Sequence, residues 1–189
     1  MIGRLFGRTS PRERMIRDLH VRINAAARVP ALYTALGVPD TVEGRFECLS
    51  LHVILVLRRL NRLPEPAADV AQDLINAIFL QLDSSLRESG IGDFGVPKRM
   101  KKLGAAFYGR AAGYDAALDA GDGDALAGAL ARNVLGGAAP ADAADLARYV
   151  AASDRLLASL DLDAFVEAGP RFAAIESAAQ PANQSGVSR

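Results

Sequence analysis

The sequence predicts an all-α protein, folded as a single compact domain of about seven or eight helices. Apolar residues recur at intervals of three and four along most of the 189-residue chain, the spacing of a buried helix face. Helix-starting Ser-Pro, Asp and Pro residues and helix-ending glycines divide these stretches, and no segment alternates strictly as a half-buried strand would. We expect a flexible N-terminus at residues 1–9, a helical domain at 10–174, and a disordered Ala-, Gln- and Ser-rich tail at 175–189.

The first two helices are predicted from residues that start and stop helices. Ser10 and Pro11 form an N-cap and first-turn pair, which opens a helix that continues to about Val29. A short helix then covers residues 30–36 and stops at Gly37.

The third helix is expected to be the central and most buried element. Asp40 and Glu43 form a predicted capping box at its start. One face of this helix carries Phe46, Leu49, Val53, Leu57 and Leu60. Leu51, Ile54, Leu55 and Val56 extend the apolar surface around nearly the whole helix. Pro64 and Pro66 break the chain before a fourth helix, whose apolar row is Val70, Leu74, Ile78 and Leu82.

The second half of the chain repeats this pattern. After a glycine-rich segment, an amphipathic helix carries the apolar residues Met100, Leu103, Phe107, Tyr114 and Leu118. GDGD at 121–124 is a turn with an Asp cap and precedes a helix that ends near Leu135. GGAAPAD interrupts the helical pattern and precedes a helix that holds Leu146, Tyr149, Val150, Leu156 and Leu157. The last predicted turn is DLDAFVEAG.

Charge is balanced overall but polarised along the chain. Residues 1–62 hold eleven arginines and five acids, whereas residues 111–189 hold five arginines and eleven acids. Such polarity suits docking to another protein rather than bulk binding of DNA. The single cysteine, Cys48, excludes an internal disulfide and lies in an apolar run, so we expect a buried thiol in a reducing compartment.

The sequence indicates a cytoplasmic protein. Its N-terminus lacks the apolar stretch of a secretion signal, and the apolar run at 48–57 is too short to span a membrane. Near the start, apolar residues interleave with Arg4 and Arg8, which allows at most a weak peripheral contact at the inner face of the membrane.

Residues 89–102 read SGIGDFGVPKRMKK and match two nucleotide-binding motifs by letter. GIGDFG fits G-x-G-x-x-G, but a dinucleotide site needs a strand before the glycines, and the preceding QLDSSLRES continues a helical pattern. DFG fails likewise, because no other kinase motif accompanies it. We interpret both matches as coincidences within a tight connection between helices.

The residues after these glycines are unusual in another way. Pro97 suits the first position of a helix, so four cations fall at the positive end of the helix dipole: Lys98, Arg99, Lys101 and Lys102. These lysines are the only three in a chain with nineteen arginines, and at about 100° per residue they lie opposite the apolar row, facing water. Placing cations at the positive end of a helix is unfavourable, and because no structural gain is visible, these residues are candidates for a functional role. The competing interpretation is a solvated face with Glu88 and Asp93 as counter-charges.

Two long blocks resemble one protein family. The stretch LDSSLRESGIGDFGVPKRMKKLGAAFYGRAAGYDAAL, residues 82–118, closely resembles the signature of the ubiquinol–cytochrome c chaperone family. YTALGVPDTVEGRFECLSLHVILVLRRL, residues 33–60, is similar to that family's upstream region, and the resemblance covers most of residues 12–150. The matching positions are Asp83, Leu86, Arg87, Glu88, Gly90, Gly92, Asp93, Val96, Pro97, Lys98, Lys101, Tyr108, Gly109 and Arg110, with Gly37, Pro39, Asp40, Thr41, Gly44, Arg45, Phe46 and His52 upstream.

The resemblance implies an all-helical, non-enzymatic assembly factor for cytochrome b and the ubiquinol–cytochrome c reductase complex. It implies newly made cytochrome b as the client, with a small partner protein and the ribosome as further candidate partners. A holder of such a client needs an apolar groove with charged rims. The candidate partner-binding residues are Arg87, Asp93, Phe94, Val96, Lys98, Arg99, Lys101, Lys102 and Arg110.

Other interpretations stay open at this point. A small helical protein could bind a phosphate-bearing ligand or cofactor with the segment from Gly90 to Lys102, whose N–H groups and lysines suit an anion. Arg87 and Glu88 could instead pair with Asp93 and Arg110 and simply fix the turn.

The two histidines do not predict a cofactor site. His20 and His52 lie on different predicted helices; because His52 is in an apolar helix, we expect a hydrogen-bonded core residue rather than a haem ligand. No His or Cys cluster has the spacing of a metal site. The sequence therefore assigns no cofactor.

Overall fold

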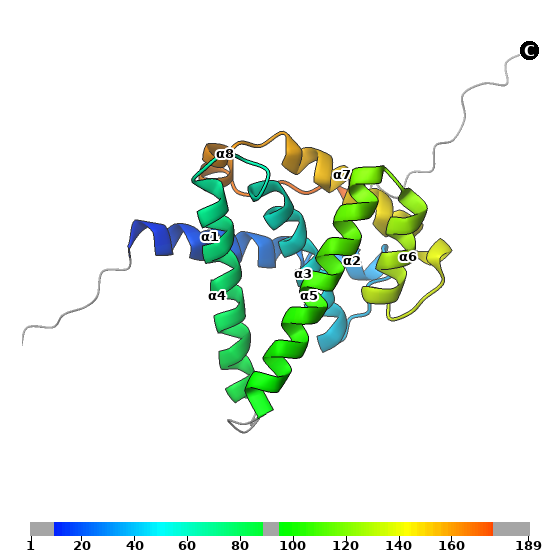
Figure 1. The fold of residues 1–189 in the computed structure, drawn as a ribbon. Helices are drawn as coiled ribbons and strands as arrows, with labels where there is room; N and C mark the ends of the chain where they lie inside the picture. The colour runs from blue at the N-terminus through cyan, green and yellow to red at the C-terminus, as the bar shows by residue number, and fades with distance from the viewer. Residues whose placement is uncertain (1–9, 89–94, 176–189) are drawn as a thin grey trace, which may run out of the picture.

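The computed structural model describes residues 10–88 and 95–175. Within these residues the chain forms eight α-helices, one 3-10 helix and no strand, which confirms the predicted all-α class (Figure 1). The elements are α1 Pro11–Ala26, α2 Pro30–Thr34, α3 Val42–Leu60, α4 Ala67–Glu88, α5 Gly95–Ala120, α6 Gly123–Asn133, η1 Pro140–Ala143, α7 Ala144–Ala158 and α8 Leu162–Glu167. None of these helices is both long and apolar enough to cross a membrane. The expected flexible N-terminus and nearly all of the expected tail lie outside the described residues.

Side-chain caps set the starts of several helices. Ser10 begins α1 with the predicted cap, because its hydroxyl accepts from the Glu13 N–H at 3.1 Å and the Glu13 carboxylate accepts from the Ser10 N–H at 2.8 Å. The expected cap of α3 was wrong by one residue. Thr41, not Asp40, accepts a hydrogen bond from the N–H of Gly44 at 3.0 Å. Asp40 is left outside the helix and pairs with Arg45 at 2.6 Å.

Helix α3 is the central element, as the apolar circumference of its sequence predicts. It contacts α1, α4, α5 and α7 and lies among them (Figure 1). The residues from Ser50 to Val56 are all buried.

One charge is buried among these apolar residues. Arg58, at the C-terminal end of α3, has a side chain only 5% exposed. Its Nη1 donates to Asp115 at 2.9 Å and its Nη2 to Asp119 at 2.6 Å, both on α5, while Nε donates to Asp154 of α7 at 2.9 Å. Burial lowers the pKa of Arg58, but hydrogen bonds to the three carboxylates outweigh it and leave that pKa above its ordinary value. The Arg58 cluster therefore joins α3, α5 and α7.

The first turn of α3 requires a glycine at position 44. A Cβ on Gly44 would lie 2.0 Å from the carbonyl oxygen of Pro39. This distance is far below any real contact, so the chain can pass over the first turn of α3 only where no side chain is present.

Helices α4 and α5 form a V. They approach each other at the Glu88 and Gly95 ends, which project beyond the other helices, and diverge toward their opposite ends (Figure 1). The glycine-rich segment thus follows a helix rather than a strand, as predicted, whereas residues 89–94 themselves lie outside the described part of the chain.

Candidate functional site

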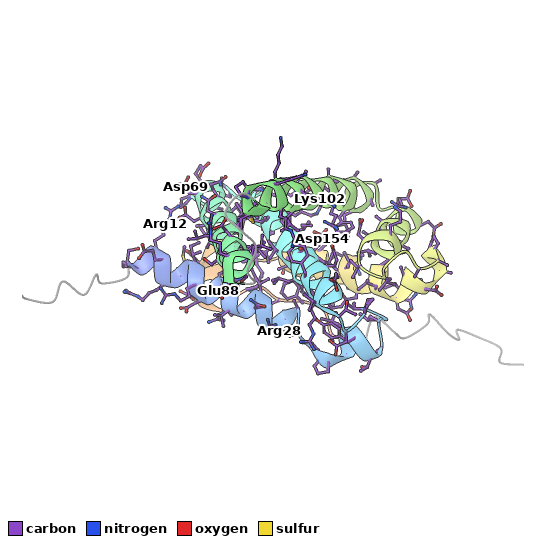
Figure 2. All side chains as sticks on the ribbon, turned by 90° about the horizontal axis from the view of Figure 1, so that it is seen from below. Arg12, Arg28, Asp69, Glu88, Lys102 and Asp154 are labelled. Carbon is purple, nitrogen blue, oxygen red and sulfur yellow. The ribbon has the colours of Figure 1, made fainter. Side chains whose placement is uncertain are left out.

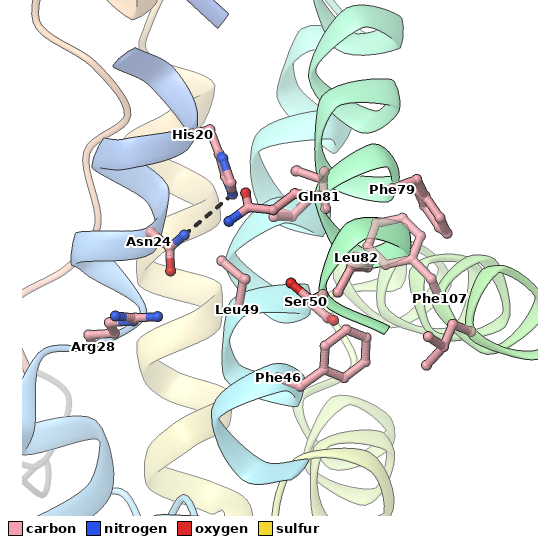
Figure 3. A pocket seen from close by; sticks show the side chains of 14 residues that line it. His20, Asn24, Arg28, Phe46, Leu49, Ser50, Phe79, Gln81, Leu82 and Phe107 are labelled. Carbon is pink, nitrogen blue, oxygen red and sulfur yellow. Dashed lines mark hydrogen bonds between the residues drawn. The ribbon is translucent and has the colours of Figure 1, made fainter. Parts of the chain in front are cut away.

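A cavity of about 120 Å3 lies where α4 and α5 meet α1 and α3. Figure 3 shows its two different walls. His20 and Asn24 of α1, and Arg28 just beyond its end, supply a polar wall, in which Nδ2 of Asn24 lies 3.3 Å from Nε2 of His20. The rest of the lining comes from α3, α4 and α5 and is mostly apolar, with Phe46, Leu49, Val53, Ile78, Phe79, Leu82, Leu103 and Phe107, but it also holds the polar residues Ser50, Gln81 and Ser85. This cavity suits a side chain with an apolar body rather than a charged group.

Two aromatic rings fix the α4–α5 wall. Phe79 and Phe107 meet edge to face, with centroids 6.0 Å apart and planes at 84°. Gly104 faces this pair, and a Cβ there would lie 3.6 Å from the Phe79 ring, an ordinary van der Waals contact. Phe107 also contacts Tyr108, whose side chain leads outward and is 59% exposed.

The four cations predicted at the start of α5 lie in water. Lys98, Arg99, Lys101 and Lys102 are all exposed, and no carboxylate in the described part of the chain pairs with any of them. Figure 2 places Lys102 on α5 at the edge of the molecule. Leu103 and Phe107 line the cavity from the apolar side of α5, so the lysines lie on the opposite side of the helix and the basic residues are outside the cavity lining.

The helix start differs from the prediction in a way that changes the electrostatics. α5 begins at Gly95, so Pro97 is its third residue and Lys98 its fourth. The unfavourable effect of a cation on the helix dipole falls off within the first turn. The cations are therefore less costly here than their predicted positions imply, which weakens the argument from a broken local rule.

The structure separates the other proposed partner-binding residues. Val96 is fully buried, so the expectation that it offers an exposed apolar contact is wrong. Arg87 is exposed and pairs with Asp83 one turn earlier at 2.7 Å. Arg110 reaches Glu47 of α3 at 2.6 Å, and this long-range pair replaces the predicted contacts of Arg110 near the glycines. Asp93 and Phe94 lie outside the described residues.

The Glu47–Arg110 pair is part of a partly buried polar cluster. The two side chains are only 15% and 19% exposed, and burial raises the pKa of Glu47 although the charge of Arg110 lowers it. Among the described residues, no hydrogen-bond partner is found for the second carboxylate oxygen of Glu47, for Nε of Arg110, or for the hydroxyl of Tyr114. Buried polar atoms without a protein partner are uncommon in folded proteins.

His52 is a core residue with both ring nitrogens in use. Nδ1 lies 2.8 Å from the carbonyl oxygen of Cys48, which can only accept, so Nδ1 carries the proton. Nε2 then accepts from the hydroxyl of Tyr149 at 2.8 Å, and the ring packs against Phe172. Burial lowers the pKa of His52 to about 4 and raises the pKa of the neighbouring Cys48 thiol to about 12. This residue is hydrogen-bonded and inside the core, as expected.

Sequence reasoning missed the α1 wall of the cavity and the Arg58 cluster. The contribution of His20, Asn24 and Arg28 depends on how α1 crosses α3, which a local pattern does not encode. A signal for Arg58 was present, because a charge at the end of an apolar helix must be paired when buried, and Asp115 and Asp119 are spaced one turn apart.

Comparisons with known proteins agree with this architecture. The family profile described as ubiquinol-cytochrome C chaperone matches residues 34–172. The solved crystal structure of the Cbp3 homolog from Brucella abortus is similar, with a TM-score of 0.79 and 40% sequence identity. The match covers 87% of this chain and 92% of that chain. A search of curated proteins gives no match.

The family profile spans most of the chain, including the cavity walls from α3, α4 and α5 and the basic start of α5. The likeness to the Brucella structure extends over the same helices at an identity well above that of fold similarity alone. It follows that the chain belongs to the ubiquinol–cytochrome c chaperone family.

Proposed function

We propose that this protein is an assembly chaperone that holds newly made cytochrome b and promotes assembly of the ubiquinol–cytochrome c reductase complex. Family membership supports a role in that assembly. The observation that supports the finer proposal is the cavity between α1, α3, α4 and α5, together with the exposed cations near the start of α5, which have no carboxylate partner among the described residues. The chaperone would act in the cytoplasm, at the inner face of the membrane.

The cavity has the size of a single side chain. An engineered protein cavity of ~150 Å3 lined by apolar residues accommodates benzene, so about 120 Å3 suits one aliphatic or aromatic side chain of an unassembled helix. A membrane protein offers many such side chains before it is assembled. Lys98, Lys101 and Lys102 would then contact acidic groups or carbonyls at the end of that helix.

Deleting the gene and measuring assembled reductase complex tests the function as a whole. The expected result is loss of the assembled complex with cytochrome b still synthesised. Normal assembly in the deletion strain would contradict the proposal.

Charge reversal tests the basic residues directly. In the variant K98E/K101E/K102E we expect unchanged circular dichroism and at least a severalfold loss of co-purified cytochrome b. The matched control reverses three exposed arginines away from the cavity, Arg17, Arg155 and Arg171, and should retain the client. Equal recovery with both variants would remove the lysines from the binding site.

Filling the cavity tests its apolar wall. Leu49 lines the cavity from α3, and L49F adds volume there while keeping an apolar side chain. We expect weaker recovery of cytochrome b at nearly unchanged melting temperature. Wild-type recovery with a filled cavity, shown by its structure, would place the client elsewhere.

A further inference from the structure

The outer face of α5 carries two glycines that the fold itself does not need. Gly109 and Gly113 are exposed in the helix, and a Cβ on either would meet no atom within 4 Å. Glycine in the middle of a helix lowers its stability relative to alanine. Gly104 on the same helix faces inward, where a Cβ would contact Phe79 at 3.6 Å, whereas Gly109 and Gly113 face open space. Their spacing, G-x-x-x-G, places both on one face, as in helix pairs whose backbones approach closely.

These glycines line a groove of about 350 Å3 between α5 and α6. Its floor is made of small residues, Ala106, Gly109 and Gly113 of α5 and Ala129 of α6. Its polar side is made of Arg110, Arg132 and Asn133. A groove with a flat floor of this kind accepts a helix more readily than a bulky side chain.

A buried donor lies behind the polar side of the groove. Tyr114 is only 1% exposed, and no partner in the described part of the chain makes a hydrogen bond of good geometry with its hydroxyl. That hydroxyl lies near Asn133, Arg110 and Arg132, the three polar residues of the groove. Arg110 already donates to Glu47, whereas the Tyr114 hydroxyl and Arg132 are donors without a well-placed acceptor among the described residues.

The positive charge continues along the same face. At about 100° per residue, Lys98, Arg99 and Lys102 fall on the side of α5 that carries Gly109 and Gly113. Lys102 precedes Gly109 by two turns, about 10 Å along the axis. All three cations are exposed and unpaired within the described residues.

We propose that this outer face of α5, from Lys98 to Gly113, docks an acidic helix of a partner protein. Close packing of the two helices would occur over Gly109 and Gly113. A carboxylate of the partner would meet Arg132, and others would meet Lys102 and Lys98. Nucleic acid fits less well, because phosphates need the cations but gain nothing from glycines. The groove shares no lining residue with the cavity between α1, α3, α4 and α5, whereas Lys98 and Lys102 enter both proposals. The glycine variants and L49F, rather than the lysine variants, therefore distinguish the two sites.

The test begins with a photoreactive amino acid in the full chain in cells. Benzoylphenylalanine replaces Ala106 in the groove or, as the control, the exposed Leu156 of α7. The crosslinked segment is identified by mass spectrometry and synthesised, and its affinity for the purified protein is measured. We expect a helical segment with net negative charge, crosslinked at Ala106 and not at Leu156. A basic segment, a second copy of this chain, or equal crosslinking at both positions overturns the proposal.

Two glycine variants then separate docking from folding. G109L/G113L should weaken binding of that segment at least tenfold, because the added side chains fill the groove floor. G109A/G113A should raise the melting temperature of the free protein while still weakening binding, and K98Q/R99Q/K102Q should reduce its salt dependence. Unchanged affinity in G109L/G113L refutes close packing at the glycines. L49F should keep the crosslink, so failure of the client site leaves this result intact.

Discussion

The two ends of α5 differ in how their charges are used. Near the C-terminal end, Asp115 and Asp119 hold Arg58 between α3, α5 and α7, where its side chain is 5% exposed. Near the N-terminal end, Lys98, Lys101 and Lys102 are exposed and have no carboxylate partner among the described residues. One helix therefore carries charges that hold the fold together and charges that no described residue pairs. Burial, rather than the number of charges, distinguishes the two uses.

Removing the centre of the Arg58 cluster should have the largest effect. Arg58→Met leaves three carboxylates without their common partner, and we expect the free energy of unfolding to fall by about 3 kcal/mol, as when one partner of a buried ion pair is lost. The partial exposure of those carboxylates keeps the value at the low end of the range. Urea denaturation gives the measurement, with Arg155→Met on α7 as the exposed control. A loss below 1 kcal/mol in R58M would show that the cluster does not hold the three helices.

Burial of His52 should make the stability of the folded protein sensitive to acid. Its pKa is about 4 when folded and about 6.5 when unfolded, so the unfolded chain binds the proton first as pH falls. Stability is therefore complete above about pH 6.5 and is lost toward pH 4, by up to roughly 1.4 kcal/mol per pH unit. The raised pKa of Glu47 acts in the opposite direction, because the folded state binds that proton more tightly.

Comparison with H52Q isolates the histidine. Glu47 is common to both proteins, so the difference in unfolding free energy between wild type and H52Q should shrink from pH 7 to pH 4.5. A constant difference over this range would mean that His52 does not titrate as its burial predicts.

Neutralising the exposed lysines should have the smallest effect on stability. Because α5 starts at Gly95, the lysines lie beyond the first turn, and K98Q/K101Q/K102Q should change the unfolding free energy by no more than a few tenths of a kcal/mol, with a slight gain at low salt. Thermal denaturation at two salt concentrations provides the test. A loss of 1 kcal/mol or more would indicate that the lysines serve the fold after all.

Local signals predicted the elements well, and long-range packing limited the prediction of the site. The Ser10 cap, the apolar circumference of α3 and the row from Val70 to Leu82 all depend on neighbours within a turn or two, which the sequence displays. The pairing of Arg110 with Glu47 joins residues 63 positions apart and depends on the crossing of α3 and α5. The burial of Val96 likewise could not be predicted from its place in a glycine-rich segment.

The contact beneath Gly44 has a consequence for genetics. A Cβ there would overlap the Pro39 carbonyl, so every missense change at this codon should unfold the start of α3 and behave like a null allele. Under the proposed function, such an allele would impair assembly of the reductase complex without reporting on any binding surface. A loss-of-function screen should therefore find variants of Gly44. These variants then serve as a reference for folding defects, against which variants that impair binding alone can be recognised.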